Sequence, residues 1–436
     1  MAGSDARPSP AARSRTKRRI RDSGALAAGS VVAGLLAYGS FALTTHSLGA
    51  EGAAPVSILW SYWTAVAAVL TFTLQHWTIR TLAHDRHEGT VARSLPTIAI
   101  MAAVLAGLAG LVAYVFREAL FGDPGIIFPV LVAVITVGSM FIGLVRGALV
   151  GRHRYGATAA SLVGENAVRL ILAVAVAVTG GGSVAFGVAL ACGPVIGLVW
   201  VRSLRFDRTP AAAPVSESGS VLAMVSETAG GSLISQVVLT SAPVVLAAVG
   251  GAPDQVTSLF VALAVWRAPY VVALGVTPKL TGGLTRLAVN RQVKQLARFR
   301  ILTMAGVAGV AAVAVLVGLT LFQPLLHVAF GSDIGLPNWA LAATGVGTAI
   351  AIGNLVLLLL MLAFGRSRQA TAAWAVAVAV AAGWLGLSSA LAPTSRVVAA
   401  FVIAEASAFI LLLGLSIRVP AAEQPAPYPQ PQLRTS

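Results

Sequence analysis

The chain alternates between long apolar blocks and short polar stretches. The blocks are continuous and rich in Ala, Leu and Val. A helix needs about 20 apolar residues to cross the roughly 30 Å hydrocarbon core of a bilayer. Strands of a membrane barrel would instead show short segments of alternating polarity. The pattern therefore predicts an all-α integral membrane protein.

Twelve blocks are long enough, and they form two groups of six. The first six spans are expected near 24–47, 55–79, 95–116, 125–146, 157–179 and 182–202; the second six near 221–249, 256–277, 300–323, 338–364, 369–391 and 396–418. We predict a basic N-terminal tail (1–22), a six-helix lobe (23–203), a linker (204–220), a second six-helix lobe (221–418) and a disordered Pro-rich tail (419–436).

The basic residues predict the orientation of these helices. With this set of spans, 26 of the 30 Lys and Arg residues fall on one side, including Arg146 in the connection after the fourth block. Arg117 and Arg396 fall on the opposite side, and Arg169 and Arg267 fall within spans. The positive-inside rule makes the basic side cytoplasmic. We expect a multi-pass protein of the cell (cytoplasmic) membrane with both termini in the cytoplasm.

A weak internal repeat supports the division of the chain into two lobes. The segment after the first span of each half has a Gly-containing turn, one acidic residue (Glu51 or Asp254) and an aromatic-bearing helix. This weak repeat fits a parallel duplication of the kind found in transporters.

The segment 279–299 interleaves basic and apolar residues, so we expect an amphipathic helix on the anionic lipids of the cytoplasmic leaflet.

Composition excludes several classes of protein. Apolar residues make up 57% of the chain and charged residues only 10%, whereas soluble domains carry about 25% charged residues. The net charge of +15 comes from short loops, so no nucleic-acid partner is expected. Cys192 is the single cysteine, and the chain carries no enzyme or metal-site motif. We expect no cofactor, no metal and no enzymatic activity.

Polar residues within the expected fifth span are the first candidates for substrate binding. Glu165 and Arg169 are four residues apart and share a helix face, and Asn166 lies beside them. An ionisable group inside a membrane usually faces a cavity or a partner. The group could line a cavity, with Arg169 binding an anionic head group, or it could be a self-neutralised pair that packs two helices together.

The second half holds further polar residues within its spans. Arg267 is central in the eighth span, with no acidic residue one turn away, so we favour contact with a phosphate over a structural ion pair. Glu405 and Glu227 could carry a proton during transport or bond to neighbouring helices. Gln236 and Asn354 could bind sugar hydroxyls or join helices by hydrogen bonds.

The stretch from Ser226 to Arg286 resembles the MOP flippase superfamily, and within it the polysaccharide-transport branch. It contains APVVLAAVGGAPDQVTSLFVALAVWRAPYVVALGVTPKLTGGLTRL. In that family the region reads as a helix, a Gly-containing turn and a helix with Arg-x-Pro and a later Pro. Arg267, Pro269 and Pro278 match this pattern. The first lobe lacks the arginine cluster expected in its first two helices.

The resemblance implies a MATE-like fold of two lobes that rock during alternating access. The implied substrate is a polyprenyl-(di)phosphate-linked oligosaccharide for cell-surface polysaccharide, whose phosphate would meet Arg267 and Arg169. The lipid-linked glycan and anionic membrane lipids are the expected partners, with glycosyltransferases or a polymerase of the same pathway as further ones.

Other functions remain open at this stage. A MATE-type proton- or sodium-coupled antiporter would share the fold but needs acidic residues facing a cavity. A major-facilitator transporter would also have twelve helices, but Asp85-Arg86 lacks that group's surrounding pattern. A non-transporting scaffold for glycan assembly is a further alternative. A membrane glycosyltransferase is another, and it is less favoured because no loop is long enough for an obvious catalytic site.

Overall fold

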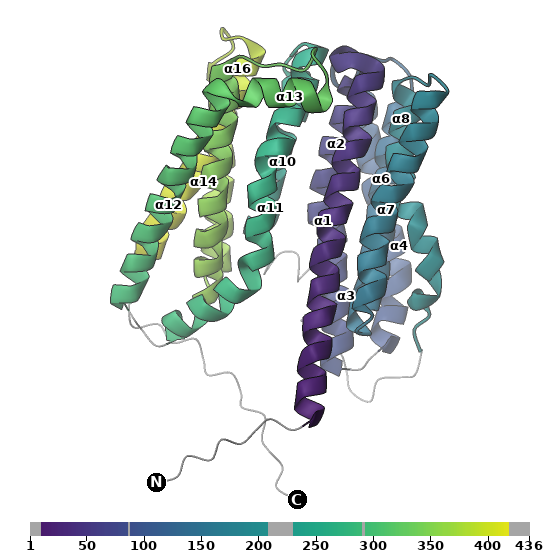
Figure 1. The fold of residues 1–436 in the computed structure, drawn as a ribbon, viewed down its shortest axis with the longest axis vertical. Helices are drawn as coiled ribbons and strands as arrows, with labels where there is room; N and C mark the ends of the chain where they lie inside the picture. Colours follow the sequence, from purple (N-terminus) through teal and green to yellow (C-terminus); the bar gives the residue numbers. More distant parts are fainter. Residues whose placement is uncertain (1–9, 86–87, 208–229, 290–292, 418–436) are drawn as a thin grey trace, which may run out of the picture. The chain divides into compact units, whose positions relative to one another are not determined.

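The computed structural model describes residues 10–85, 88–207, 230–289 and 293–417, with side chains for residues 26, 28–82, 88–207, 230–273 and 294–417. Every regular element in these ranges is a helix (Figure 1). The first half contains α1 (Pro10–Gly52), α2 (Ala54–Val66), η1 (Ala67–Thr71), α3 (Phe72–Asp85), α4 (Glu88–Val115), α5 (Arg117–Phe121), α6 (Ile127–Gly151), α7 (Tyr155–Val178), α8 (Ser183–Ala191) and η2 (Gly193–Leu204). The second contains α10 (Gly230–Ala248), α11 (Pro253–Val289), α12 (Val293–Thr320), α13 (Phe322–Phe330), α14 (Asn338–Ala363), α15 (Ser367–Leu387) and α16 (Pro393–Ile417).

Twelve helical stretches of the described chain are long and apolar enough to cross a membrane. The second joins α2, the π-helical turn η1 and α3, and the sixth joins α8 and the 3₁₀ helix η2. All twelve overlap the spans predicted from hydropathy, so the all-α architecture of a multi-pass membrane protein is confirmed.

The chain folds as two compact units. The first comprises Met1–Met224, Ala247–Thr257 and His327–Ile334; the second comprises Val225–Leu246, Ser258–Leu326 and Gly335–Ser436. Each unit therefore contains most of one predicted six-helix lobe, although two short pieces of the later chain belong to the first unit. One of these pieces is attached through Thr257, whose hydroxyl donates to the Ala50 carbonyl at 2.6 Å.

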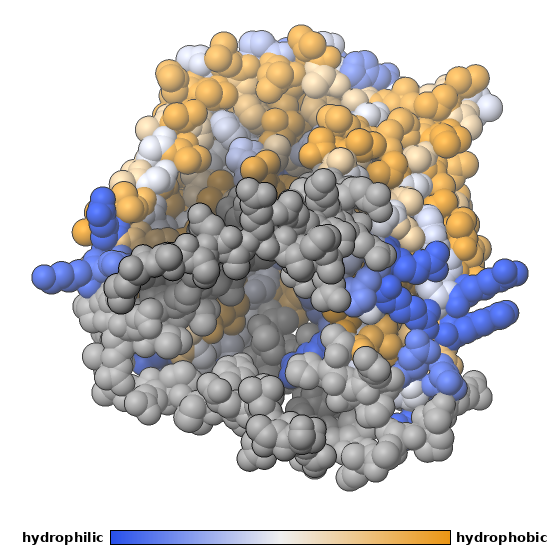
Figure 2. Space-filling model, turned by 60° about the horizontal axis from the view of Figure 1, so that its bottom comes forward, coloured by the Kyte–Doolittle hydropathy of each residue, from blue (hydrophilic) through white to orange (hydrophobic). Residues whose placement is uncertain are grey.

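One helix lies at the centre of each unit. In their most apolar windows, α6 is 61% buried and α14 is 67% buried, compared with 22% for α4 and 11% for α12. The outer helices expose large apolar side chains, such as Leu108 at 54% and Leu316 at 64%. Figure 2 shows apolar side chains over most of the described surface in view, with hydrophilic residues gathered towards the end turned forward. Such a surface is suited to lipid rather than to water.

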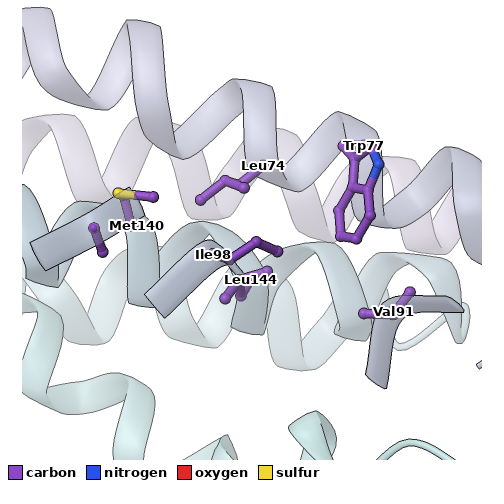
Figure 3. Packing of buried hydrophobic residues seen from close by; sticks show 7 residues of the cluster. Leu74, Trp77, Val91, Ile98, Met140 and Leu144 are labelled. Atoms are coloured by element: carbon purple, nitrogen blue, oxygen red, sulfur yellow. The ribbon is translucent and has the colours of Figure 1, made fainter. Parts of the chain in front are cut away.

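The first unit packs α3, α4 and α6 around an apolar cluster (Figure 3). Trp77 of α3 is 3% exposed, and Val91 of α4 is fully buried. Met140 and Leu144 contribute from α6, one turn apart on the same face. This cluster fixes one side of α6, and the opposite side is left to carry polar groups.

Glycines on α6 allow the second span to approach closely. Gly143 and Gly147 are four residues apart on α6. A Cβ on Gly143 would lie 2.7 Å from the Thr71 carbonyl oxygen of η1, and a Cβ on Gly147 would lie 2.6 Å from the Thr78 Cβ of α3. Small residues at this spacing allow close contact between membrane helices. The close contact between α6 and α3 continues past Gly147, and α6 remains helical to its end at Gly151.

Some predicted segments take a different form. Residues 10–22 of the expected tail are the beginning of α1. Residues 279–289 of the expected amphipathic helix continue α11, and 293–299 begin α12; their position on a lipid surface stays a prediction. Residues 208–220 of the linker and the tail from 419 lie outside the described residues.

Candidate substrate-binding site

A buried ion cluster joins α6 and α7 in the first unit. Glu165 on α7 binds two guanidinium groups, one with each carboxylate oxygen. Arg169 Nη2 lies 2.5 Å from Oε1, and Arg146 Nη2 lies 2.5 Å from Oε2. The predicted pair of Glu165 and Arg169 is thus present, and it has a second arginine as partner.

Arg169 is enclosed on every side. Its side chain is 0% exposed, and its guanidinium donates to the Asn166 Oδ1 at 3.1 Å and to the Leu190 carbonyl at 3.0 Å. The ring of Trp63 on α2 covers one face, with its centroid 3.9 Å from Cζ. Gly193 leaves the room that the guanidinium occupies, because a Cβ there would lie 2.5 Å from Arg169 Nε. Arg169 therefore joins α2, α7, α8 and η2.

Arg146 corrects a prediction from the sequence. The charge pattern predicts it in a cytoplasmic connection, but it lies inside α6 and is buried. Its Nε donates to the Ser161 hydroxyl at 3.1 Å, and its Nη2 donates to the Ser161 carbonyl and to Glu165. The prediction was wrong because the span was ended at the first charged residue, whereas glycine-mediated packing continues α6 through Gly151.

Arg146 is the least enclosed of the three charged side chains in the cluster. The Arg146 side chain is 8% exposed, compared with 3% for Glu165. The hydrogen bonds of Arg146 within the cluster are made by its Nε and Nη2. Among the described residues, these contacts leave the Nη1 group of Arg146 as unused donor capacity, and none of the contacts of Arg169 involves it.

The cluster has one positive charge in excess, because it contains two guanidinium groups and one carboxylate. Burying a charge is costly unless it is paired and hydrogen-bonded. The nearest other contacts are neutral: the Ser161 hydroxyl and carbonyl, the Asn166 amide and the Leu190 carbonyl. A visiting anion would balance this charge.

A second polar group lies within the second unit. The Asn354 side-chain amide of α14 donates to the Glu405 carboxylate of α16 at 2.8 Å and to the Glu405 backbone carbonyl at 2.9 Å. Both residues are 0% exposed. Asn354 thus joins two helices, and this geometry supports its structural interpretation over contact with a sugar.

The remaining candidates of the second half lie around Tyr270. Gln236 of α10 donates to the Tyr270 hydroxyl of α11 at 2.5 Å. Arg267 precedes Tyr270 by three residues on the same helix. Arg267 itself is half-buried. Glu227 lies outside the described residues.

The described residues include no group of three or more His, Cys, Asp or Glu side chains placed to hold a metal ion. No family model matches the chain. No curated protein matches it either.

Solved structures do match it over most of its length. An inward-facing multidrug resistance MATE family transporter of the MOP superfamily aligns with a TM-score of 0.61 and 16% identity, covering 88% of this chain and 93% of that one. The lipid II flippase MurJ, in an inward closed conformation, aligns with a TM-score of 0.66 and 13% identity, covering 92% and 88%. The chain has the MOP-superfamily fold.

A third MOP-fold structure bears on the chemistry of the site. It is a MOP superfamily transporter from Pyrococcus furiosus, described as having a binding pocket of reverse polarity that suggests a different function. It aligns with a TM-score of 0.55 and 17% identity, covering 91% of this chain and 94% of that one. The MOP fold thus serves more than one kind of substrate, and the charges of a given chain have to indicate which.

Proposed function

We propose that this protein is a flippase that moves a polyprenyl-(di)phosphate-linked oligosaccharide across the cytoplasmic membrane for cell-surface polysaccharide biosynthesis, by alternating access. The observation that carries the proposal is the excess positive charge of the cluster formed by Arg146, Glu165 and Arg169. A guanidinium group pairs strongly with phosphate. A diphosphate-linked lipid brings the matching charge into the membrane together with its own hydrocarbon chain.

In this proposal the two arginines of the first unit have different tasks. Arg169 holds Glu165 and the surrounding helices in place, and Arg146 offers Nη1 to the phosphate. Arg267, half-buried in the second unit, is proposed as a separate contact for the phosphate within that unit. Gln236 is half-buried near it, and its amide is the proposed contact for a sugar hydroxyl.

The fold likeness to a lipid II flippase supports this class of substrate. In this proposal, glycosyltransferases or a polymerase of the same pathway supply and consume the lipid-linked glycan. Both termini of the chain lie in the cytoplasm. A flippase needs no chemistry at the glycan, so no enzymatic step is assigned to the chain.

A MATE-type antiporter is the second candidate, and one observation favours it. Glu405 is a fully buried carboxyl group in the second unit whose Oε1 has no hydrogen-bond partner among the described residues. Such a carboxyl group can bind and release a proton during transport. The likeness to multidrug MATE transporters fits this candidate as well.

Transport by the full chain in liposomes separates the two candidates. One set of vesicles carries a polyprenyl diphosphate with a fluorescent oligosaccharide, and a membrane-impermeant reductant reports which leaflet holds the label. A second set carries a fluorescent organic cation under an imposed pH gradient. The flippase proposal predicts protein-dependent movement of the lipid and no gradient-driven efflux of the cation. Cation efflux without lipid movement would overturn it in favour of the antiporter.

A further inference from the structure

The second unit carries an apolar groove between α10, α15 and α16. The groove has a cavity of about 140 Å³, and its wall is made almost entirely of alanine, valine and other apolar side chains, with no charged residue. An apolar cavity of about 150 Å³ accepts a molecule the size of benzene. The cavity therefore has room for part of a hydrocarbon chain.

The groove follows the direction of the membrane-spanning helices. On α15 its lining runs from Val378 to Leu385, and on α16 from Val397 to Ala404. Seven residues of helix correspond to about 10 Å. Val378 is 39% exposed and Ala382 is also exposed, so the groove is open along the α15 side. A straight acyl chain parallel to the helices fits this shape.

A cation lies at one end of the groove. Arg396 is in the first turn of α16 and precedes the lining residue Val397. Its Nη2 donates to the carbonyl of Leu385, another lining residue, at 2.7 Å. The Arg396 side chain is half-buried, so the guanidinium is not sealed inside the helix bundle. The N-terminus of α16 adds partial positive charge at the same place.

The neighbourhood of Arg396 is typical of a membrane–water interface. The indole N–H of Trp384 donates to the Arg396 backbone carbonyl at 3.2 Å, and tryptophan is enriched at the depth of the lipid head groups. Within the described chain, Arg396 has no ion pair with a carboxylate. Charge and shape therefore match an amphiphile with one chain in the groove and an anionic head at Arg396.

We propose that this groove is a binding site for an anionic phospholipid of the bilayer, with one acyl chain between α10, α15 and α16 and its phosphate at Arg396. This site lies wholly within the second unit and is independent of the proposed flippase activity. It would hold a resident lipid, which supports the contact between α10 and α15 where alanines leave space.

Native mass spectrometry of the full chain tests the site. The protein is titrated with phosphatidylglycerol or with phosphatidylcholine of the same acyl chains, and retained lipid is counted. We expect about fivefold tighter retention of the first phosphatidylglycerol, since one arginine near a lipid surface contributes about 1 kcal/mol. Arg396→Gln should remove this preference, and Arg396→Lys should keep it.

Matched variants keep the test specific. Arg117→Gln removes a cation that already pairs with Glu118 at 3.9 Å, and it should leave the preference unchanged. Ala382→Leu fills the groove and should lower retention of both lipids, whereas Ala379→Leu, an exposed position on the same helix outside the groove lining, should not.

Three results would overturn the proposal. The first is equal retention of the two lipids by the wild type. The second is an unchanged preference in Arg396→Gln. The third is displacement of phosphatidylglycerol by an equimolar polyprenyl phosphate, which would assign the groove to the transported lipid instead.

Discussion

The guanidinium of Arg146 lies 2.5 Å from the carboxylate of Glu165, a residue 19 positions later on the next long helix. The same carboxylate holds Arg169 through its other oxygen. Glu165 is thus shared by two cations that would repel each other without it. Stability and substrate binding both depend on this sharing, and each can be tested separately.

Replacing the shared carboxylate of Glu165 should destabilise the protein more than replacing Arg146. Glu165→Gln leaves two buried guanidinium groups without a counter-charge, and breaking a buried ion pair in this way costs about 3–5 kcal/mol. Arg146→Gln leaves the neutral pair of Glu165 and Arg169 in place. Thermal unfolding of the purified variants in one detergent should rank Glu165→Gln clearly lowest. Equal melting temperatures for the two variants would contradict this account of the cluster.

The space beside Gly193 should be as important as the charges. Gly193→Ala would place a Cβ 2.5 Å from Arg169 Nε, so the guanidinium would have to leave its hydrogen bonds and the Trp63 ring. Overpacking of this kind costs about 1–3 kcal/mol. Gly107→Ala in α4 is the control, because no atom lies within 4 Å of the added Cβ. The first variant should melt at a lower temperature and the second should not.

Glu405 distinguishes the two candidate functions. Glu405→Gln keeps an oxygen that can accept from Asn354, so the fold should be retained and movement of the polyprenyl lipid should continue at a similar rate. Loss of transport by this variant, with folding intact, would favour proton coupling through Glu405.

Asn354→Leu should lower the free energy of unfolding of the protein. It removes the 2.8 Å hydrogen bond to the buried Glu405 carboxylate, and leaving a buried polar group unsatisfied costs about 1–3 kcal/mol. Chemical unfolding of wild type and variant in the same detergent measures this cost. An unchanged midpoint would mean that the hydrogen bond contributes nothing to the contact between α14 and α16.

The orientation of the helices can be tested with single cysteines. In a Cys192→Ser background, Glu118→Cys should react with an impermeant maleimide added to intact cells, because Glu118 is 74% exposed and is predicted outside. Gln369→Cys should react only after the membrane is opened. The opposite pattern would reverse the predicted topology.

Hydropathy predicted all twelve spans because helices in a bilayer must be long and apolar. The i,i+4 spacing of Glu165 and Arg169 predicted their ion pair for a similar reason, since that spacing alone brings the two side chains together. Both features depend on local sequence and on the regular geometry of one helix.

The partners that come from other helices could not be predicted in this way. Arg146 was missed because a charge at the edge of an apolar block looks like the beginning of a loop. The signal that α6 continues was the spacing of Gly143, Gly147 and Gly151, which is typical of close helix packing. The bond between Asn354 and Glu405 crosses 51 residues, and only the tertiary arrangement of α14 and α16 determines it.

The most direct test of the central claim is the initial rate at which the polyprenyl diphosphate oligosaccharide crosses liposome membranes with Arg146 or Arg152 replaced. Arg152, six residues later at the C-terminal end of α6, pairs with Glu88 at 2.9 Å in a partly exposed position, so Arg152→Gln is the matched control. A charge-assisted hydrogen bond contributes about 1.5–3 kcal/mol, so Arg146→Gln should slow movement by roughly tenfold or more, with partial recovery in Arg146→Lys. Wild-type rates in a folded Arg146→Gln protein would contradict the proposal that this cluster receives the lipid phosphate.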